Sequence, residues 1–457
     1  MTAAICQLPA RILAARIAAG ELSAREVTAA HLERIAALNP GLNAVVSLDA
    51  EGARSAAAAA DRAVAAGAKL GPLHGVPITL KDSIDVAGMR TTIGSSVFDR
   101  MAERDSAVAE RLRSAGAIIL GHTNVPPFLS DYQTDNGVFG RTDNPWDRTR
   151  TPGGSSGGAA AALAVGMSAL DVGSDLAGSL RLPASFCGVY ALKTTELRVS
   201  MRGFFRPLPG VPPSVRILSG LGPIARDLGD IELALSILAG PDAEDADLPP
   251  VPLAIPPNAR RRLAISLFPD VEFSSSYRRR METLAHDVRA QGIEVVDRTP
   301  ALEWNALHAL FRDLVGTLTG LFDPGAKLRD EQRTLAWYLG ALEARDRFVA
   351  ALQPFFADCD AWILPSAIAS AFAHAAPFGQ IEVEGRSRSY SDHAAPLVFC
   401  NLFGLPSLTV PAGIDELGLP IGVQLVGPRW SEPSLIAIAR ELERSGALPG
   451  FRAPPNG

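Results

Sequence analysis

The sequence predicts an α/β fold, because segments typical of strands alternate with segments typical of helices. An apolar run at 76–80 precedes a capped helical segment at 105–115, and a second apolar run follows at 117–120. The same order recurs where an alanine-rich helical segment at 158–167 leads into a short strand at 169–172. This alternation predicts a mostly parallel or mixed sheet covered by helices. With 457 residues, 47% of them hydrophobic, the chain can bury a large core.

The N-terminal part is expected to form a helical packing arm. Residues 8–39 predict two helices, and the second begins with a capping box of Ser23 and Glu26 and ends at Asn39, directly before a proline. Residues 56–66 predict a further helix, because alanine dominates this stretch and has the highest helix propensity.

The second half of the chain has fewer periodic segments. Proline and glycine at 201–215 predict an irregular loop, and the residues at 241–260 predict an exposed connection rich in proline and aspartate. Helices are expected at 274–291, 332–352 and 431–446, and two strands within 397–427.

Composition argues against several classes of protein. A net charge of -6 provides no basic surface for nucleic acid. No apolar run is long enough for a membrane span, and the N-terminus lacks the core of a signal peptide. The four cysteines are scattered without a CxxC pair, which favours neither a zinc site nor a disulfide framework and suits a reducing cytoplasm. We therefore expect no metal and a cytoplasmic location.

The stretch 151–188 carries two serine sites in glycine-rich turns, TPGGSSGG and GSDLAGSLR. Ser155 and Ser156 lie at the entrance of the alanine-rich helix, and Ser179 lies in a second turn, so that one helix and one strand separate the sites. This spacing allows the two sites to face each other. Successive N–H groups in such a turn also form an anion-binding nest.

Several interpretations of this stretch compete. A phosphate loop is disfavoured because no lysine follows the glycines. The GxSxG pattern of a nucleophile elbow fits both Ser155 and Ser156, but no strand precedes them. A flexible linker is disfavoured because structured apolar sequence lies on both sides. A Ser-His-Asp hydrolase stays open, since its partners can be distant in sequence, although none of the seven histidines has a convincing catalytic context.

A lysine is the candidate general base. Of the 43 basic residues all but Lys69, Lys81, Lys193 and Lys327 are arginines. Arginine does not lose its proton in proteins, whereas a lysine removed from water does. Lys81 stands at the end of the apolar run VPITL, where burial is expected.

The chain resembles the amidase signature family over about residues 60–440. The resemblance rests on four motifs in the family's order, GPLHGVPITLKD (71–82), PGGSSGG (152–158), GSDLAGSLRLPASFCG (173–188) and NLFGLPSLTVPAG (401–413). Carried over by position, it implies a Ser-cisSer-Lys triad with Ser179 as nucleophile, Ser155 as relay after a cis peptide, and Lys81 as base. It also implies a large mixed sheet between helical layers.

The resemblance also implies the surroundings of the triad. The oxyanion would be bound by main-chain N–H groups, those of Leu176, Ala177, Gly178 and Ser179. The family commonly has glycine where Ala177 stands, so a positive φ there would strain the alanine. The residues matching the family's substrate-facing loop are Leu129, Ser130 and Asp131, and we expect Phe204, Phe205 and Leu208 to line an apolar pocket or pack in the core. Ser156, Asp175 and Arg181 are expected to support the site from behind, with the two charged residues paired to each other or to the backbone.

The main hypothesis is a cofactor-independent amidohydrolase that works through an acyl-enzyme, with carbamates and esters as further substrates. The substrate is a small amide or carbamate, and the chain acts as a monomer or homodimer. The alternative is an amidotransferase subunit that releases ammonia for partner subunits and tRNA; a non-catalytic relative is a third class. The chain is expected to be a single domain with an N-terminal arm, a catalytic core, a variable helical region and a C-terminal part with sheet strands, at about 1–60, 60–240, 241–390 and 391–457.

Overall fold

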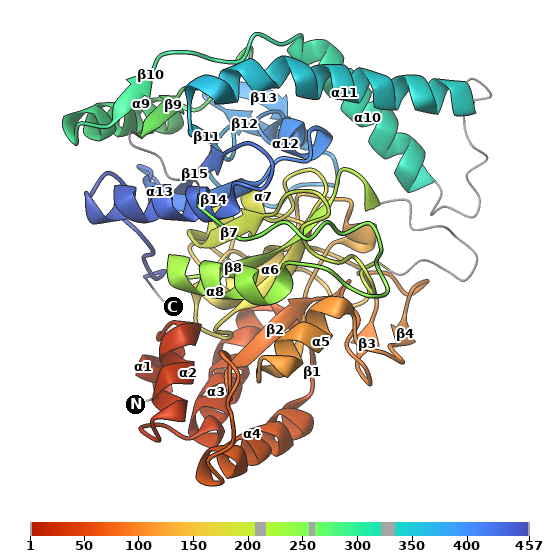
Figure 1. Cartoon of the computed structure of the whole chain (residues 1–457), viewed down its shortest axis with the longest axis vertical. Coiled ribbons are helices and arrows are strands. Elements are labelled where there is room, and N and C mark those ends of the chain that lie inside the picture. Colours follow the sequence, from red (N-terminus) through yellow and green to blue (C-terminus); the bar gives the residue numbers. More distant parts are fainter. Residues whose placement is uncertain (1, 206–215, 256–260, 321–333, 456–457) are drawn as a thin grey trace.

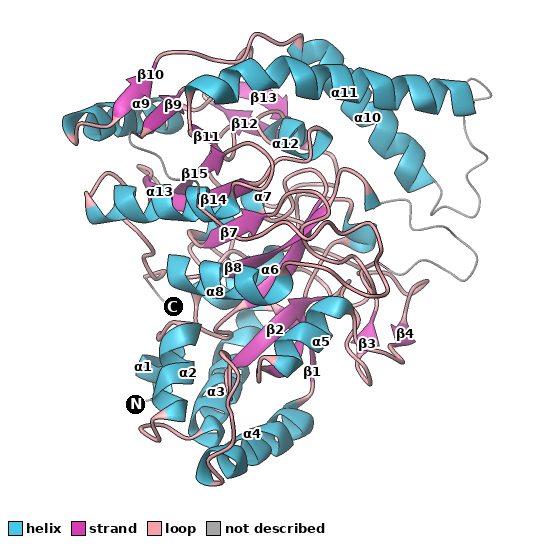
Figure 2. Cartoon of the chain, in the orientation of Figure 1, coloured by secondary structure: helices cyan, strands magenta, loops and turns pink. Residues whose placement is uncertain are grey.

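The computed structural model describes residues 2–205, 216–255, 261–320 and 334–455. In this part of the chain an 11-stranded sheet runs through the molecule with helices packed against it (Figures 1 and 2), which confirms the predicted α/β class. Neighbouring strands pair in both parallel and antiparallel directions, so the sheet is mixed. In order across the sheet, the strands are β1 (Val45–Leu48), β5 (Ile118–Thr123), β2 (Pro77–Lys81), β6 (Asp171–Asp175), β8 (Gly220–Ala225), β7 (Tyr190–Lys193), β14 (Ser407–Ile414), β15 (Pro420–Val426), β11 (Ala361–Pro365), β9 (Arg262–Ile265) and β10 (Glu294–Val296).

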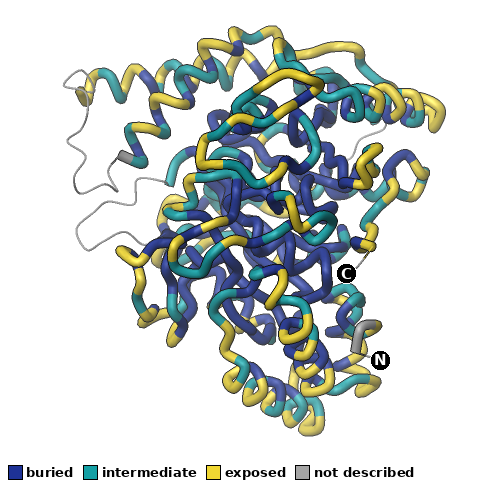
Figure 3. Tube along the Cα trace, turned by 180° about the vertical axis from the view of Figure 1, so that it is seen from behind, coloured by how far each residue is buried: buried dark blue, intermediate teal, exposed yellow. Residues whose placement is uncertain are grey.

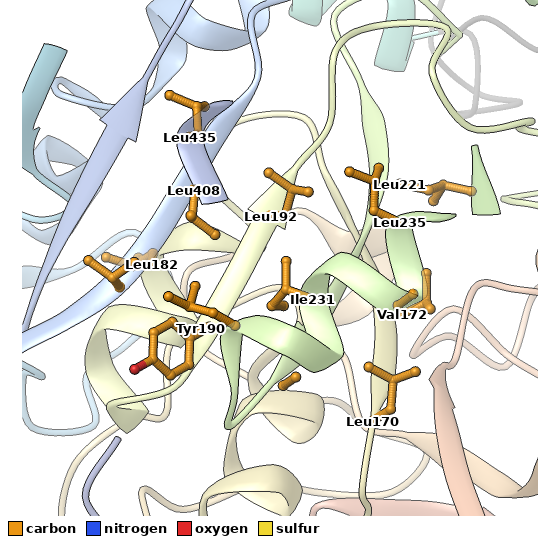
Figure 4. Close-up of a cluster of buried hydrophobic side chains, with 14 of the residues drawn as sticks. Leu170, Val172, Leu182, Tyr190, Leu192, Leu221, Ile231, Leu235, Leu408 and Leu435 are labelled. Atoms are coloured by element: carbon orange, nitrogen blue, oxygen red, sulfur yellow. The ribbon is translucent and has the colours of Figure 1, made fainter. Parts of the chain in front are cut away.

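The helices cover both faces of this sheet. Alternate residues of a strand point to opposite faces. On β7 and β8, Ala191 and Ile224 join a cluster with α6 and α7, whereas Leu192 and Leu221 lie with Ile231 of α8 (Figure 4). The helices are α1 (Thr2–Cys6), α2 (Ala10–Ala18), α3 (Ala24–Leu42), α4 (Ala50–Ala65), α5 (Ala107–Ser114), α6 (Gly157–Ala164), α7 (Arg181–Cys187), α8 (Leu228–Leu238), α9 (Ser275–Ala290), α10 (Trp304–Gly320), α11 (Leu335–Asp358), α12 (Val398–Leu402) and α13 (Glu432–Arg444).

Burial is deepest where the two serine-bearing turns lie. All residues of β2, α6 and β6 are buried, and the tube in Figure 3 is dark blue through the middle of the molecule and yellow mainly at its two ends. Helix α6 fits there because alanine and glycine side chains let it lie close to the sheet. In the described residues no helix is both long and apolar enough to cross a membrane.

Several predicted boundaries were wrong. Helix α3 runs through Pro40 to Leu42, because the side chain of Asn39 accepts the N–H groups of Ala44 and Val45 and holds the chain after the helix. Helix α4 begins at Ala50, capped by Asp49, instead of at residue 56. The interval 241–390, expected to be mainly helical, also contributes the strands β9, β10 and β11 and a hairpin of β12 (Gln380–Val383) and β13 (Arg386–Ser389).

Candidate active site

Lys81 ends strand β2 with its side chain fully buried. Its Nζ lies 2.7 Å from Ser155 Oγ, 3.0 Å from Ser174 Oγ and 3.4 Å from the main-chain oxygen of Ser174. Burial lowers the pKa of Lys81 to about 7, against the opposing influence of the nearby Asp175 and Asp171 carboxylates. At neutral pH a substantial fraction of this amine is uncharged and can accept a proton.

The two serine-bearing turns meet, as the sequence predicted. The Gly154–Ser155 peptide is cis, and the following residue, Ser156, is the N-cap of α6 and donates its main-chain N–H to the oxygen of Ser179 at 3.1 Å. Ser155 and Ser179 both line one cavity. The relay serine of the expected triad therefore contacts Lys81 and shares a cavity with the expected nucleophile.

The turn from 176 to 179 connects β6 to α7. Gly178 has φ 105, and an added Cβ would lie 2.4 Å from Leu397 Cδ1, so both its backbone and its surroundings require glycine. Ala177 is not among the positive-φ residues, and the strain anticipated for it does not arise. Within the described residues, the N–H groups of Leu176, Ala177 and Ser179 have no acceptor, whereas the Gly178 N–H donates to Asp175 Oδ1 at 2.8 Å. That hydrogen bond is at odds with the expected role of the Gly178 N–H in binding an oxyanion.

Asp175 and Arg181 form the expected ion pair beneath this turn. Arg181 Nη2 lies 2.9 Å from Asp175 Oδ1 and both side chains are fully buried. Asp175 also accepts the N–H of Leu180 at 3.1 Å, so its carboxylate holds the backbone on both sides of Ser179. Burial alone raises the pKa of Asp175, but the Arg181 charge and its hydrogen bonds outweigh this and hold the pKa well below its usual range. The pair is therefore ionised and fixes the turn.

Residues from the C-terminal part complete this support, and sequence reasoning gave them no role. Asn401 Nδ2 donates to Asp175 Oδ1 at 3.0 Å, while Arg181 donates to Asn401 Oδ1 at 2.7 Å and to Gln424 Oε1 at 3.0 Å. Asn401 stands within one of the four family motifs, NLFGLPSLTVPAG, so a buried polar residue amid apolar ones was the available signal. Gln424 carries no comparable signal, because only the fold brings β15 to this place.

A cavity of about 1010 Å³ opens at Ser155 and Ser179. Every substrate-contact residue expected from the sequence within the described part lines it: Leu129, Ser130, Asp131, Phe204 and Phe205, together with Leu176 and Ala177. Leu208 lies outside the described residues. Sequence reasoning missed much of the apolar lining, including Val97, Phe98, Phe128, Phe311, Val315, Phe378, Tyr390 and Val398.

Four lining residues other than glycine adopt positive φ, namely Phe128 (54°), Leu129 (60°), Phe205 (40°) and Phe378 (57°). Such conformations are unfavourable for L-residues and tend to cluster at functional sites. They aim bulky side chains into the cavity.

In the described residues, no group of three or more His, Cys, Asp and Glu side chains is arranged to hold a metal ion. The four cysteines are buried free thiols. Of the histidines, His308 lines the cavity, and burial lowers its pKa.

Comparison with known proteins places the chain in a family. The Amidase family profile matches residues 26–315 and 312–436. An indoleacetamide hydrolase of Bradyrhizobium diazoefficiens is 33% identical over 95% of this chain and 86% of its own length, and the GatA-type subunit of glutamyl-tRNA(Gln) amidotransferase from Synechococcus sp. is 31% identical over 95% of both. The solved structure of a 6-aminohexanoate cyclic dimer hydrolase with substrate superimposes with a TM-score of 0.82 at 27% identity, covering 99% of each chain. The chain belongs to the amidase signature family.

Proposed function

We propose that this protein hydrolyses amides through an acyl-enzyme, with Ser179 as nucleophile, Ser155 as proton relay and Lys81 as general base. The observation that carries the proposal is the contact of 2.7 Å between Lys81 Nζ and Ser155 Oγ, made by a fully buried amine whose pKa burial lowers to about 7. Family membership supports amide cleavage as the reaction class.

Each step is a proton transfer or a bond exchange between these groups. Ser179 Oγ bonds to the amide carbon as its proton passes to Ser155 and the Ser155 proton passes to Lys81. The carbonyl electrons move onto the oxygen, which the N–H groups of Leu176, Ala177 and Ser179 would bind, each donor contributing about 3 kcal/mol. Lys81 then returns the proton through Ser155 to the departing nitrogen. Water attacks the ester by the same relay and releases a carboxylic acid and Ser179.

The cavity favours aryl and alkyl substrates. Its lining is mainly apolar, with phenylalanines on several sides, and such surfaces bind apolar groups more strongly than small polar amides. Carbamates and esters fit the same nucleophile and oxyanion donors, so we propose them as further substrates. The chain would work alone, as a monomer or homodimer, in the cytoplasm.

The amidotransferase alternative is favoured by the relative of 31% identity that belongs to a glutamyl-tRNA(Gln) amidotransferase. It predicts glutaminase activity that depends on partner subunits. The apolar cavity favours the hydrolase instead, because a glutamine side chain would leave most of these phenylalanines without a partner.

The purified chain should be assayed alone against anilides, primary amides, carbamates and glutamine. Hydrolysis of an anilide, lost in Ser179→Ala, supports the proposal. Glutaminase activity without anilide hydrolysis would favour the amidotransferase, and anilide turnover that survives in Ser179→Ala would contradict the assigned nucleophile.

A further inference from the structure

Asp131 places a carboxylate in the wall of the otherwise mainly apolar cavity. It lies in the loop between β5 and α6, close to the catalytic turn: a Cβ added to Gly154 would lie 2.4 Å from the main-chain oxygen of Asp131. The next residue, Tyr132, donates its hydroxyl to the main-chain oxygen of Ala177 at 2.5 Å. The loop that carries Asp131 is therefore joined to both turns of the active site.

The side chain of Asp131 is held in one orientation through one of its two oxygens. Its Oδ1 accepts the hydroxyl of Tyr390 at 2.7 Å and the N–H groups of Tyr132 and Gln133 at 2.6 and 3.3 Å. Tyr390 is itself buried, stacks on Phe372 with ring centroids 4.9 Å apart, and accepts the N–H of Phe378. In the described part of the chain Oδ2 accepts no hydrogen bond.

No cationic side chain neutralises this carboxylate. Among the described lining residues the other charged side chains are those of Arg312 and Asp392, and Asp392 lies 3.6 Å from Arg388. Arg312 stands at an exposed position of α10. Within the described residues Asp131 has no ion-pair partner, and its removal from water raises its pKa. A half-buried carboxylate with an unused oxygen is stabilised by any ligand that brings a donor to it.

We propose that Asp131 is a specificity-determining residue that binds a protonated amine of the substrate, so that the preferred amides carry an ammonium group on an aryl or alkyl scaffold. This inference rests on the proposed amide hydrolysis and names its substrate class. The apolar walls hold the scaffold, while Asp131 Oδ2 accepts a hydrogen bond from the ammonium. The proximity of Asp131 to Gly154 places the ammonium near the scissile bond.

The test uses two matched pairs of substrates at pH 7, with the amine on either side of the scissile bond. The first pair is 3-amino-3-phenylpropanamide and 3-phenylpropanamide. The second is N-[4-(aminomethyl)phenyl]acetamide and N-(4-methylphenyl)acetamide. In at least one pair we expect kcat/KM of the wild-type protein to be about tenfold or more higher for the ammonium member, as charge-assisted hydrogen bonds require.

Asp131→Asn keeps the size of the side chain and should bring this ratio close to one. The matched control is Asp135→Asn, which removes an exposed acid of the same loop that does not line the cavity and should leave the ratio unchanged. Equal rates within both pairs, or a preference that Asp131→Asn does not reduce, would overturn the inference while leaving amide hydrolysis in place. If neither member of either pair is hydrolysed and Ser179 is not acylated, the proposed function fails and the inference falls with it.

A second measurement applies if Asp131→Asn does not fold, as judged by circular dichroism. Benzylamine and benzyl alcohol are compared as competitive inhibitors of the wild-type protein with 3-phenylpropanamide as substrate. Stronger inhibition by the amine supports an anionic subsite, whereas equal or weaker inhibition overturns it.

Discussion

The pH dependence of turnover follows from the burial of Lys81. The pKa of its amine falls from 10.5 to about 7, which corresponds to about 5 kcal/mol of preference for the neutral form at 1.36 kcal/mol per unit. The neutral amine is the base, so kcat/KM should rise with pH and level off above about pH 7. At pH 6 about a tenth of the molecules would hold a neutral Lys81, and kcat/KM should be about tenfold lower.

The assay is hydrolysis of an uncharged anilide from pH 5 to 9.5, so that the substrate itself does not titrate. Asp171, which accepts the hydroxyls of Thr79 and Thr123, has its pKa raised to about 7 by burial and titrates in the same range. The acid limb therefore belongs to Lys81 and Asp171 together. Asp171→Asn removes a negative charge that raises the pKa of Lys81, and should move the limb to lower pH. A flat profile, or a rate that keeps rising to pH 9.5, would refute the reasoning.

Three further predictions concern the turn and the cavity. Gly178→Ala brings a methyl group against Leu397 in a backbone conformation that alanine disfavours, and should lower the free energy of unfolding by about 1–3 kcal/mol in urea denaturation; an unchanged midpoint would contradict the tight contact. Asp175→Asn leaves the Arg181 guanidinium buried without its counter-ion and should cost about 3–5 kcal/mol in the same assay, whereas a loss below about 1 kcal/mol would show that the pair is not needed. Phe205→Ala should lower kcat/KM for a large arylalkyl anilide by about tenfold while sparing acetamide; equal losses for both would argue against an apolar substrate pocket.

The sequence predicts those parts of this protein that depend on local patterns. Alternating apolar and alanine-rich segments predicted the α/β class, and the motifs placed Lys81, Ser155 and Ser179 at turns that the structure brings together. The pairing of Asp175 with Arg181 followed from the cost of burying either charge alone. These inferences succeeded because each depends on residue type and short spacing.

Features that depend on tertiary contacts were not predictable in this way. Gln424 reaches Arg181 only because β15 lies beside β14 in the sheet. The commitment of the Gly178 N–H to Asp175 is a matter of local geometry that several backbone conformations of the same letters would allow. The positive φ of Phe128 and Phe378 contradicts the preference of phenylalanine itself and is maintained by surrounding structure.

The most direct test of the proposed mechanism is to identify the residue that becomes acylated. The protein is treated at pH 8 with a serine-reactive fluorophosphonate, digested, and the modified peptide is mapped by mass spectrometry. The mechanism predicts one adduct on Ser179, formed much more slowly in Lys81→Ala. Modification of Ser155 or Ser156 instead, or labelling of Ser179 at an equal rate in Lys81→Ala, would contradict it.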